Sequence, residues 1–166
     1  MPVQQSQTAP LVTTAAFRDG MALLSAPVTI VATRDADGRP WGFTASAVSS
    51  LSLDPPLLLV GIARSSSCYE AFAQAAEFTV SMLSWDHVGL AETFATSGID
   101  RFSGTDQVQD GDGLPYVRDA IGHFRCSLAQ RVDAGDHELL IGAVHEVTVR
   151  GGRPLVRYQR RFATVG

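Results

Sequence analysis

The stretch VTIVATRDADGRPWGFTASAV, residues 28–48, decides the fold class of this chain. Residues 28–34 alternate between two faces, which is typical of a β-strand. The Asp37-Gly38 pair that follows is a strong signal for a tight hairpin turn. Residues 41–48 are therefore expected to return as an antiparallel partner strand.

The rest of the chain repeats this β pattern between short amphipathic segments. Residues 96–113 are rich in Gly, Asp, Ser and Thr, so we expect a long loop with a functional role. Together, the expected strands and helices predict a mainly β fold, an antiparallel β-barrel with two or three peripheral short helices. We expect a flexible N-terminal arm over residues 1–12 and a single domain over residues 13–166. Further strands are predicted over residues 57–62, 77–83, 121–132, 137–150 and 155–157, and helices over 13–24, 69–76 and 86–95.

The composition excludes several classes of protein. Hydrophobic residues make up 45% of the 166 residues and charged residues 18%, so a folded core is expected rather than disorder. A net charge of −4 argues against a nucleic-acid binder, which needs a concentrated basic face. All 13 positive side chains are arginine, so neither Schiff-base chemistry nor a phosphate-loop lysine is available.

Neither membrane insertion nor secretion is indicated. The longest apolar run, residues 57–63, is far shorter than the ~20 residues of a membrane-spanning helix. The first residues, MPVQQSQTAP, lack the basic-then-apolar pattern of a secretion signal. Cys68 and Cys126 are too few for a disulfide framework or a four-ligand zinc site. We therefore expect a reduced, cytoplasmic protein with no metal.

The common catalytic motifs are absent from the sequence, including the glycine-rich nucleotide loops, GxSxG and HExxH. His137 and His145 would share one face of a strand about 26 Å apart, too far to bind one metal. A hydrolase or lyase that uses a serine and a histidine is one alternative, but no spacing indicates the nucleophile–base pair that it needs.

The segment GFTASAVSSLS, residues 42–52, is the first candidate binding region. Its small side chains leave the backbone accessible, which suits contact between main-chain groups and a flat heteroaromatic ring. An ordinary strand followed by a serine-rich loop is the alternative interpretation.

The segment ARSSSCYEAF, residues 63–72, is the second candidate. Three consecutive serines precede an expected helix, so hydroxyls, amides and the helix dipole could seat a phosphate, with added charge from Arg64. The alternative is simple capping of the helix by Ser66 or Ser67.

Two further features point to a ligand. His137 follows a tight turn at a strand end, from which side chains commonly reach a cleft, although a lone histidine is more often structural. The arginine-rich C-terminal segment could bind a dinucleotide phosphate, but arginines also protect exposed strand edges. Its arginines are Arg153, Arg157, Arg160 and Arg161.

Taken in order, these segments resemble the short-chain flavin reductase family, the reductase components of two-component flavin-dependent monooxygenases. The resemblance extends over residues 17–162. It is carried by FRDGMALLSAPVTIVAT, GFTASAVSSLSLDPPLLLVGI, the serine run, FTVSML, ETFA, GLPYVRDAIGHFRC, AGDHELLIGAV and PLVRYQRRF. It implies the FMN-binding split barrel, a Greek-key antiparallel split β-barrel with two or three short helices.

The resemblance also implies which residues bind ligand. Many relatives have asparagine where this chain has Ser46, whose side chain is shorter and lacks the amide. His137 falls where the family contacts the nicotinamide of NAD(P)H. The residues implied for the flavin are Thr44, Ala45, Ser46, Ser50, Leu51 and Ser52 for the ring, Ser65, Ser66 and Ser67 for the ribityl phosphate, and Phe94, Ala95 and Arg101 beside them.

The activity implied by the resemblance is NAD(P)H:flavin oxidoreduction, with a hydride passing from nicotinamide to FMN or FAD. No catalytic residue is expected, because the cofactors carry the chemistry and the protein supplies stacking and orientation. Reduced flavin would pass to a separate monooxygenase component, and the chain would form a homodimer with flavin near the interface. The residues leave open FMN or FAD, NADH or NADPH, and flavin as substrate or as prosthetic group. A non-catalytic split-barrel protein that binds flavin or a tetrapyrrole is the alternative.

Overall fold

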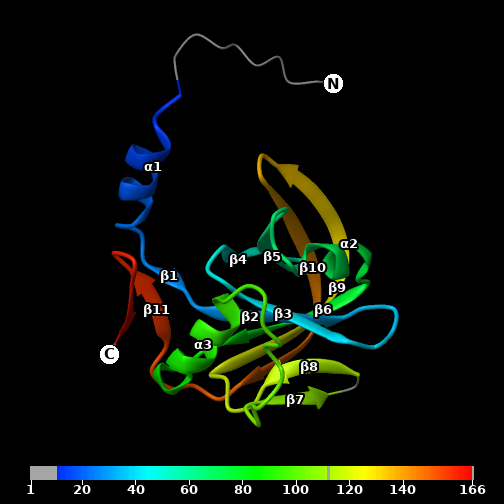
Figure 1. The fold of residues 1–166 in the computed structure, drawn as a ribbon. Coiled ribbons are helices and arrows are strands. Elements are labelled where there is room, and N and C mark those ends of the chain that lie inside the picture. The colour runs from blue at the N-terminus through cyan, green and yellow to red at the C-terminus, as the bar shows by residue number, and fades with distance from the viewer. Residues whose placement is uncertain (1–10, 112, 166) are drawn as a thin grey trace, which may run out of the picture.

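A seven-stranded antiparallel sheet forms the body of the protein (Figure 1). The structure, a computed structural model, describes residues 11–111 and 113–165, so most of the predicted N-terminal arm lies outside it. The mainly β prediction is confirmed. In spatial order the strands are β3 (Pro40–Ala45), β2 (Thr29–Arg34), β6 (Glu77–Met82), β9 (Gly122–Ala134), β10 (His137–Val149), β5 (Pro56–Ala63) and β4 (Val48–Leu53).

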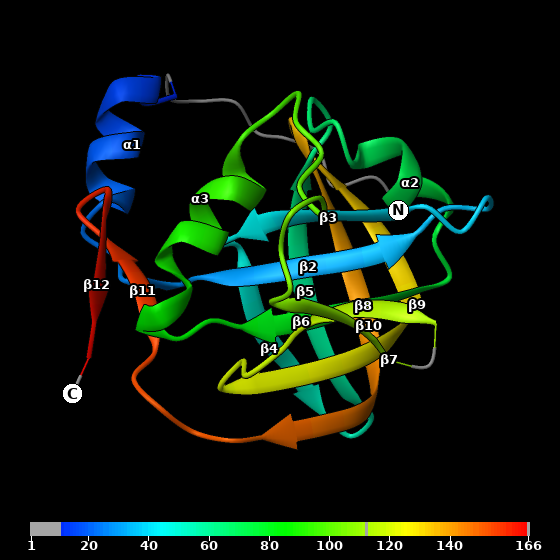
Figure 2. The same cartoon turned by 60° about the horizontal axis from the view of Figure 1, so that its bottom comes forward.

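Smaller elements surround this sheet (Figure 2). Among the described residues three α-helices are present, as expected: α1 (Thr14–Met21), α2 (Tyr69–Gln74) and α3 (Val88–Ala95), the last preceded by a 3₁₀ helix, η1 (Trp85–His87). The sequence did not predict four short strands: β1 (Ala26–Pro27), β7 (Val108–Gly111), β8 (Leu114–Val117) and β12 (Arg161–Thr164). The remaining strand, β11 (Leu155–Tyr158), forms a three-stranded sheet with β1 and β12.

The predicted hairpin between β2 and β3 is present, and a carboxylate organises its turn. Asp35 Oδ1 accepts hydrogen bonds from the backbone amides of Asp37 (3.0 Å) and Arg39 (2.9 Å). Trp41 Nε1 donates to Asp35 Oδ2 at 2.8 Å, and this bond lowers the pKa of Asp35. Gly38 has a φ of 78°, which glycine adopts without strain.

The expected single strand over residues 41–48 is wrong, because the chain turns a corner at Ser46 and Ala47. β3 ends before these two residues and β4 begins after them, yet β3 and β4 form the two opposite edges of the sheet. The sheet must therefore curve until its two edges approach each other. Gly61 of β5 donates a backbone hydrogen bond to the Ala47 carbonyl at 2.8 Å, which fixes the corner.

The buried core consists of two clusters of apolar side chains. The larger one lies within the curved sheet and beneath α2, and its fully buried residues include Phe72, Phe78 and Ile62. The second cluster packs α3 against the sheet through Phe94, which is completely buried, and Leu83. This packing fixes the position of α3 relative to β2 and β3.

Helix α1 lies outside both clusters and has no buried residue (Figures 1 and 2). Thr13 caps it by accepting a hydrogen bond from the Ala16 amide, and the helix ends at Met21, three residues before the predicted end. The Gln159 amide donates to the Ala22 carbonyl at 2.8 Å, which holds α1 against the β11–β12 hairpin. No helix in the described part of the chain is long and apolar enough to span a membrane.

Candidate functional site

A pocket of about 470 Å³ opens where β3, the end of β5 and the end of α3 meet, and we call it the β3–α3 pocket. Its lining brings together most of the residues that the sequence singled out, from five separate segments of the chain. The predicted residues that line it are Thr44, Ala45, Ser46, Ser65, Ser66, Phe94, Ala95, Arg101 and His137.

One wall of this pocket is formed by backbone and small side chains. Ala45 is buried at the end of β3, and Ala47 and Gly61 lie beside it. A Cβ atom added at Gly61 would meet the Ala47 Cβ at 3.0 Å, so the close approach of β5 to the corner favours glycine. A flat ring can therefore approach the main chain here.

Thr44 lines the pocket as expected, and its hydroxyl also makes a contact within the protein. Its hydroxyl donates to the Ala91 carbonyl at 2.6 Å and so ties β3 to α3. The hydroxyl proton is thus engaged within the protein, and toward the pocket Thr44 offers an acceptor and a methyl group.

Arg101 is a buried cation at the edge of the pocket, with 8% of its surface exposed. Nη1 donates to the Gly42 carbonyl at 2.7 Å and to Cys68 Sγ at 2.9 Å. Nε donates to the Thr96 carbonyl at 2.9 Å, and Nη2 lies 3.4 Å from Ser67 Oγ. All these partners are neutral, and no carboxylate in the described part of the chain pairs with Arg101. Because a buried charge without a counter-ion is costly, this arrangement favours an anionic ligand.

The serine run lies next to Arg101. Ser65 and Ser66 line the pocket, while Ser67 contacts the guanidinium from a neighbouring small cavity. Ser66 Oγ also accepts a hydrogen bond from the Cys68 amide at 3.2 Å, so a local capping role accompanies its place in the pocket.

Arg64 does not supply the charge expected of it. It donates to the Tyr69 hydroxyl at 2.7 Å and forms an ion pair with Asp133, so its guanidinium is engaged elsewhere. The positive charge beside the serine run comes from Arg101, which a long loop carries there from another part of the sequence.

His137 begins β10 opposite Ala63 of β5, and its side chain lines the pocket while staying 44% exposed. Its Nδ1 lies 2.7 Å from Asp136 Oδ1, and this hydrogen bond lowers the pKa of Asp136. The carboxylate thereby orients the ring and leaves Nε2 for a ligand.

The structure does not bring Ser50, Leu51 and Ser52 to this pocket. They lie on β4, beyond the corner, where Ser50 and Ser52 line a separate apolar pocket of about 400 Å³. Leu51 falls at a bulge in the pairing with β5 and is 49% exposed. Their contact with flavin stays a prediction.

Two serine–histidine hydrogen bonds occur that the spacing did not indicate. Ser84 Oγ lies 2.9 Å from His87 Nδ1, which also accepts from the Ser84 amide, so this pair caps η1. Ser127 Oγ lies 2.6 Å from His145 Nε2 across β9 and β10. Neither pair lines the β3–α3 pocket, so the hydrolase alternative gains no support there.

Sequence reasoning missed several pocket residues. Phe43, Ala47 and Ala63 lie within the two candidate segments and Ser97 lies in the expected loop, but no signal singled out these residues individually. Gly61 did carry one, because a single glycine inside the apolar run LLLVGI indicates a close backbone approach.

Known proteins resemble this chain both in sequence and in fold. Residues 21–166 match the model of the flavin reductase like domain. The chain is 49% identical over 160 residues to the NADH:riboflavin 5′-phosphate oxidoreductase of Streptomyces pristinaespiralis, covering 93% of this chain and 90% of that protein. It is 34% identical to the reductase component of 4-nitrophenol 4-monooxygenase/4-nitrocatechol 2-monooxygenase from Rhodococcus opacus, covering 97% and 85%. Among solved structures, the Streptomyces globisporus NADH:FAD oxidoreductase in complex with NAD and FAD fragments superposes with a TM-score of 0.86 at 26% identity, covering 95% and 98%.

Proposed function

Because this chain belongs to the flavin reductase-like family, we propose that it is an NADH-dependent flavin reductase that reduces FMN and supplies reduced flavin to a separate monooxygenase component. The names of two relatives support this assignment, one an NADH:riboflavin 5′-phosphate oxidoreductase and the other a monooxygenase reductase component. When both ligands are bound, the nicotinamide supplies a hydride to the flavin ring, so NADH is oxidised to NAD⁺ as the flavin gains two electrons.

The observation that carries the proposal is the buried guanidinium of Arg101, which has only neutral partners and borders the pocket beside Ser65 and Ser66. The phosphate of FMN supplies the missing negative charge, and serine hydroxyls donate to phosphate oxygens. A volume of about 470 Å³ falls in the range of small-molecule sites, roughly 300–1,000 Å³. These residues therefore fit FMN.

Each remaining residue has a positioning role. The flat wall at Ala45 and Ser46 holds the flavin ring, and Phe94 fixes α3 by packing edge-to-face on Phe102 with ring centroids 5.0 Å apart. His137, oriented by Asp136, contacts the nicotinamide and transfers no proton. We also retain main-chain contacts to the flavin from Ser50, Leu51 and Ser52 as a proposal.

We further propose that the curved sheet closes as a split barrel, since its two edge strands are joined by only two residues. Homodimerisation is supported by exposed apolar side chains on the sheet, including Leu53 (94%) and Val149 (79%). The single domain over residues 13–166 is likewise part of this proposal. The unpaired, buried cysteines support a cytoplasmic location.

The test is a steady-state assay of NADH oxidation by the purified protein with FMN, FAD or riboflavin as acceptor, followed anaerobically by the loss of flavin absorbance. We expect NADH oxidation that depends on added flavin, one flavin reduced per NADH, and a lower KM for FMN than for riboflavin. Binding of FMN without any NADH oxidation would favour the non-catalytic alternative and refute the assignment.

A further inference from the structure

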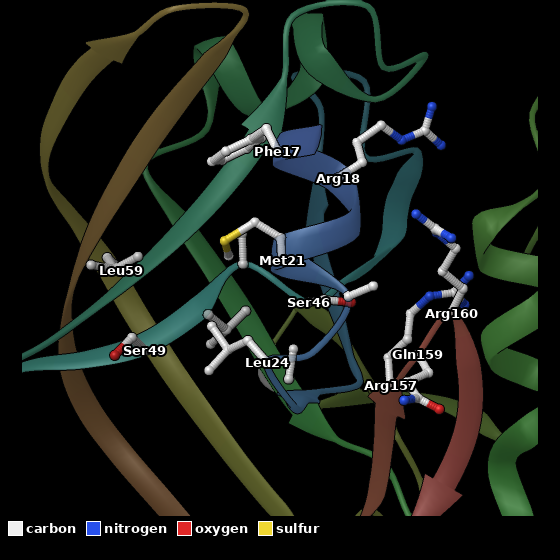
Figure 3. Close-up of a pocket in the computed structure, with 14 residues that line it drawn as sticks. Phe17, Arg18, Met21, Leu24, Ser46, Ser49, Leu59, Arg157, Gln159 and Arg160 are labelled. Atoms are coloured by element: carbon white, nitrogen blue, oxygen red, sulfur yellow. The ribbon is translucent and has the colours of Figure 1, made fainter. Parts of the chain in front are cut away.

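A second cavity of about 580 Å³ lies between α1, the β11–β12 hairpin and the start of β4, and we call it the α1 groove (Figure 3). It shares Ser46 and Ala47 with the β3–α3 pocket, so the two cavities lie on either side of the same two-residue corner. A ligand longer than the first pocket can therefore continue into the second.

The groove has two chemically different sides. Figure 3 shows Phe17 and Met21 on the side of α1 that faces β5, whereas Arg18 and Arg160 extend from the opposite side, which faces α3. Arg157 lies below them on β11. We call Arg18, Arg157 and Arg160 the arginine rim. The rim lies on the side of the groove that faces α3, and the end of α3 lines the β3–α3 pocket.

The rim carries uncompensated positive charge. Arg160 forms an ion pair with Asp19, but within the described residues no carboxylate pairs with Arg18 or Arg157. The side chains that line the groove include no aspartate or glutamate. Arg157 lies over the Phe162 ring, 5.6 Å from its centroid, a contact that leaves its donors for other partners. In a chain of net charge −4 this is a local site for an anion.

We propose that the arginine rim binds the diphosphate of NADH while the nicotinamide ring lies in the β3–α3 pocket beside His137. This inference rests on the proposed function and assigns a site to the second substrate. FMN and NADH are both anionic. Because the FMN phosphate pairs with the Arg101 guanidinium, the diphosphate of NADH requires a separate group of cations. Guanidinium groups suit it, because their paired donors match phosphate oxygens.

The experiment compares NADH with N-benzyl-1,4-dihydronicotinamide, a hydride donor that has no phosphate. The variants are Arg18→Gln and Arg157→Gln, which keep much of the side-chain stem. The matched control is Arg161→Gln, which removes the same charge from β12 outside the groove lining. Each rim variant is expected to raise the KM for NADH about 1.5- to fivefold, as loss of one exposed charge contact predicts, and the control is expected to leave it unchanged.

Four further readouts separate a binding role from a structural one. The KM for FMN and the rate with the benzyl donor should stay unchanged in both rim variants. ADP should inhibit competitively against NADH, and its inhibition constant should rise by the same factor as the KM. High salt should raise the KM for NADH in the wild type more than in a variant that combines Arg18→Gln with Arg157→Gln.

An unchanged KM for NADH in both rim variants, or an equal loss with NADH and the benzyl donor, overturns the inference. Absence of any flavin-dependent NADH oxidation in the wild type instead overturns the proposed function. ADP binding, measured calorimetrically on each variant, still reports on the rim in that case, so the two failures are distinguishable.

Discussion

Replacement of Arg101 by methionine separates binding of the flavin phosphate from binding of the flavin ring. Methionine is unbranched and apolar and fills much of the space left by the arginine stem. The Gly42 carbonyl keeps a partner, because the Cys68 thiol donates to it at 3.2 Å, whereas the Thr96 carbonyl loses its bond from Arg101. The Arg101→Met variant is therefore expected to fold as the wild type does.

The expected magnitude follows from the charge balance. A charge-assisted hydrogen bond contributes about 1.5–3 kcal/mol, so Arg101→Met should weaken FMN binding by roughly 10- to 150-fold. Riboflavin has no phosphate, and its affinity should change less than about twofold. The free energy of unfolding should change by about 1 kcal/mol or less, because removing an unpaired buried charge offsets the lost hydrogen bonds.

Titration of the intrinsic flavin fluorescence with FMN and with riboflavin measures both affinities on the same protein samples. The matched control is Arg64→Met, which removes a nearby guanidinium that binds Tyr69 and Asp133 instead. An equal loss of affinity for both flavins, or no loss for either, would refute the assignment of the phosphate to Arg101.

Three other predictions concern the scaffold. Gly61→Ala places a Cβ 3.0 Å from the Ala47 Cβ, so the corner must shift; we expect a loss of about 1–3 kcal/mol in urea unfolding and weaker FMN binding. Burial lowers the pKa of His87 below 6.5, so the unfolded state binds more protons; the melting temperature should fall as the pH drops below that value, and less steeply in His87→Gln. Burial raises the pKa of the Cys126 thiol to about 12, so it should react with a disulfide reagent at neutral pH only after unfolding, and fast reaction in the native state would contradict its environment.

Local signals in the sequence were sufficient to predict many elements. The alternation over residues 28–34 and the Asp37-Gly38 turn gave the first hairpin, because strand periodicity and turn geometry depend on neighbours only a few positions away. The serine run and the tight turn before His137 were found in the same way. Short strands such as β7, β8 and β12 escaped, since four residues are too few to establish a period.

The candidate site depended on contacts that no local pattern encodes. Arg101 reaches Cys68 and Gly42 across 33 and 59 positions in the chain, and its lack of a counter-charge is visible only once these segments meet. The corner at Ser46 and Ala47 is likewise set by pairing of the two strands with different neighbours.

The sequence by itself determined most of the segments that become strands, turns and capped helices, because those preferences arise within a few residues. Only the tertiary structure decided which charges lack a partner and which segments share a cavity. Burial and Coulombic pairing are properties of groups close in space, and the curvature of the sheet is what brings those groups together.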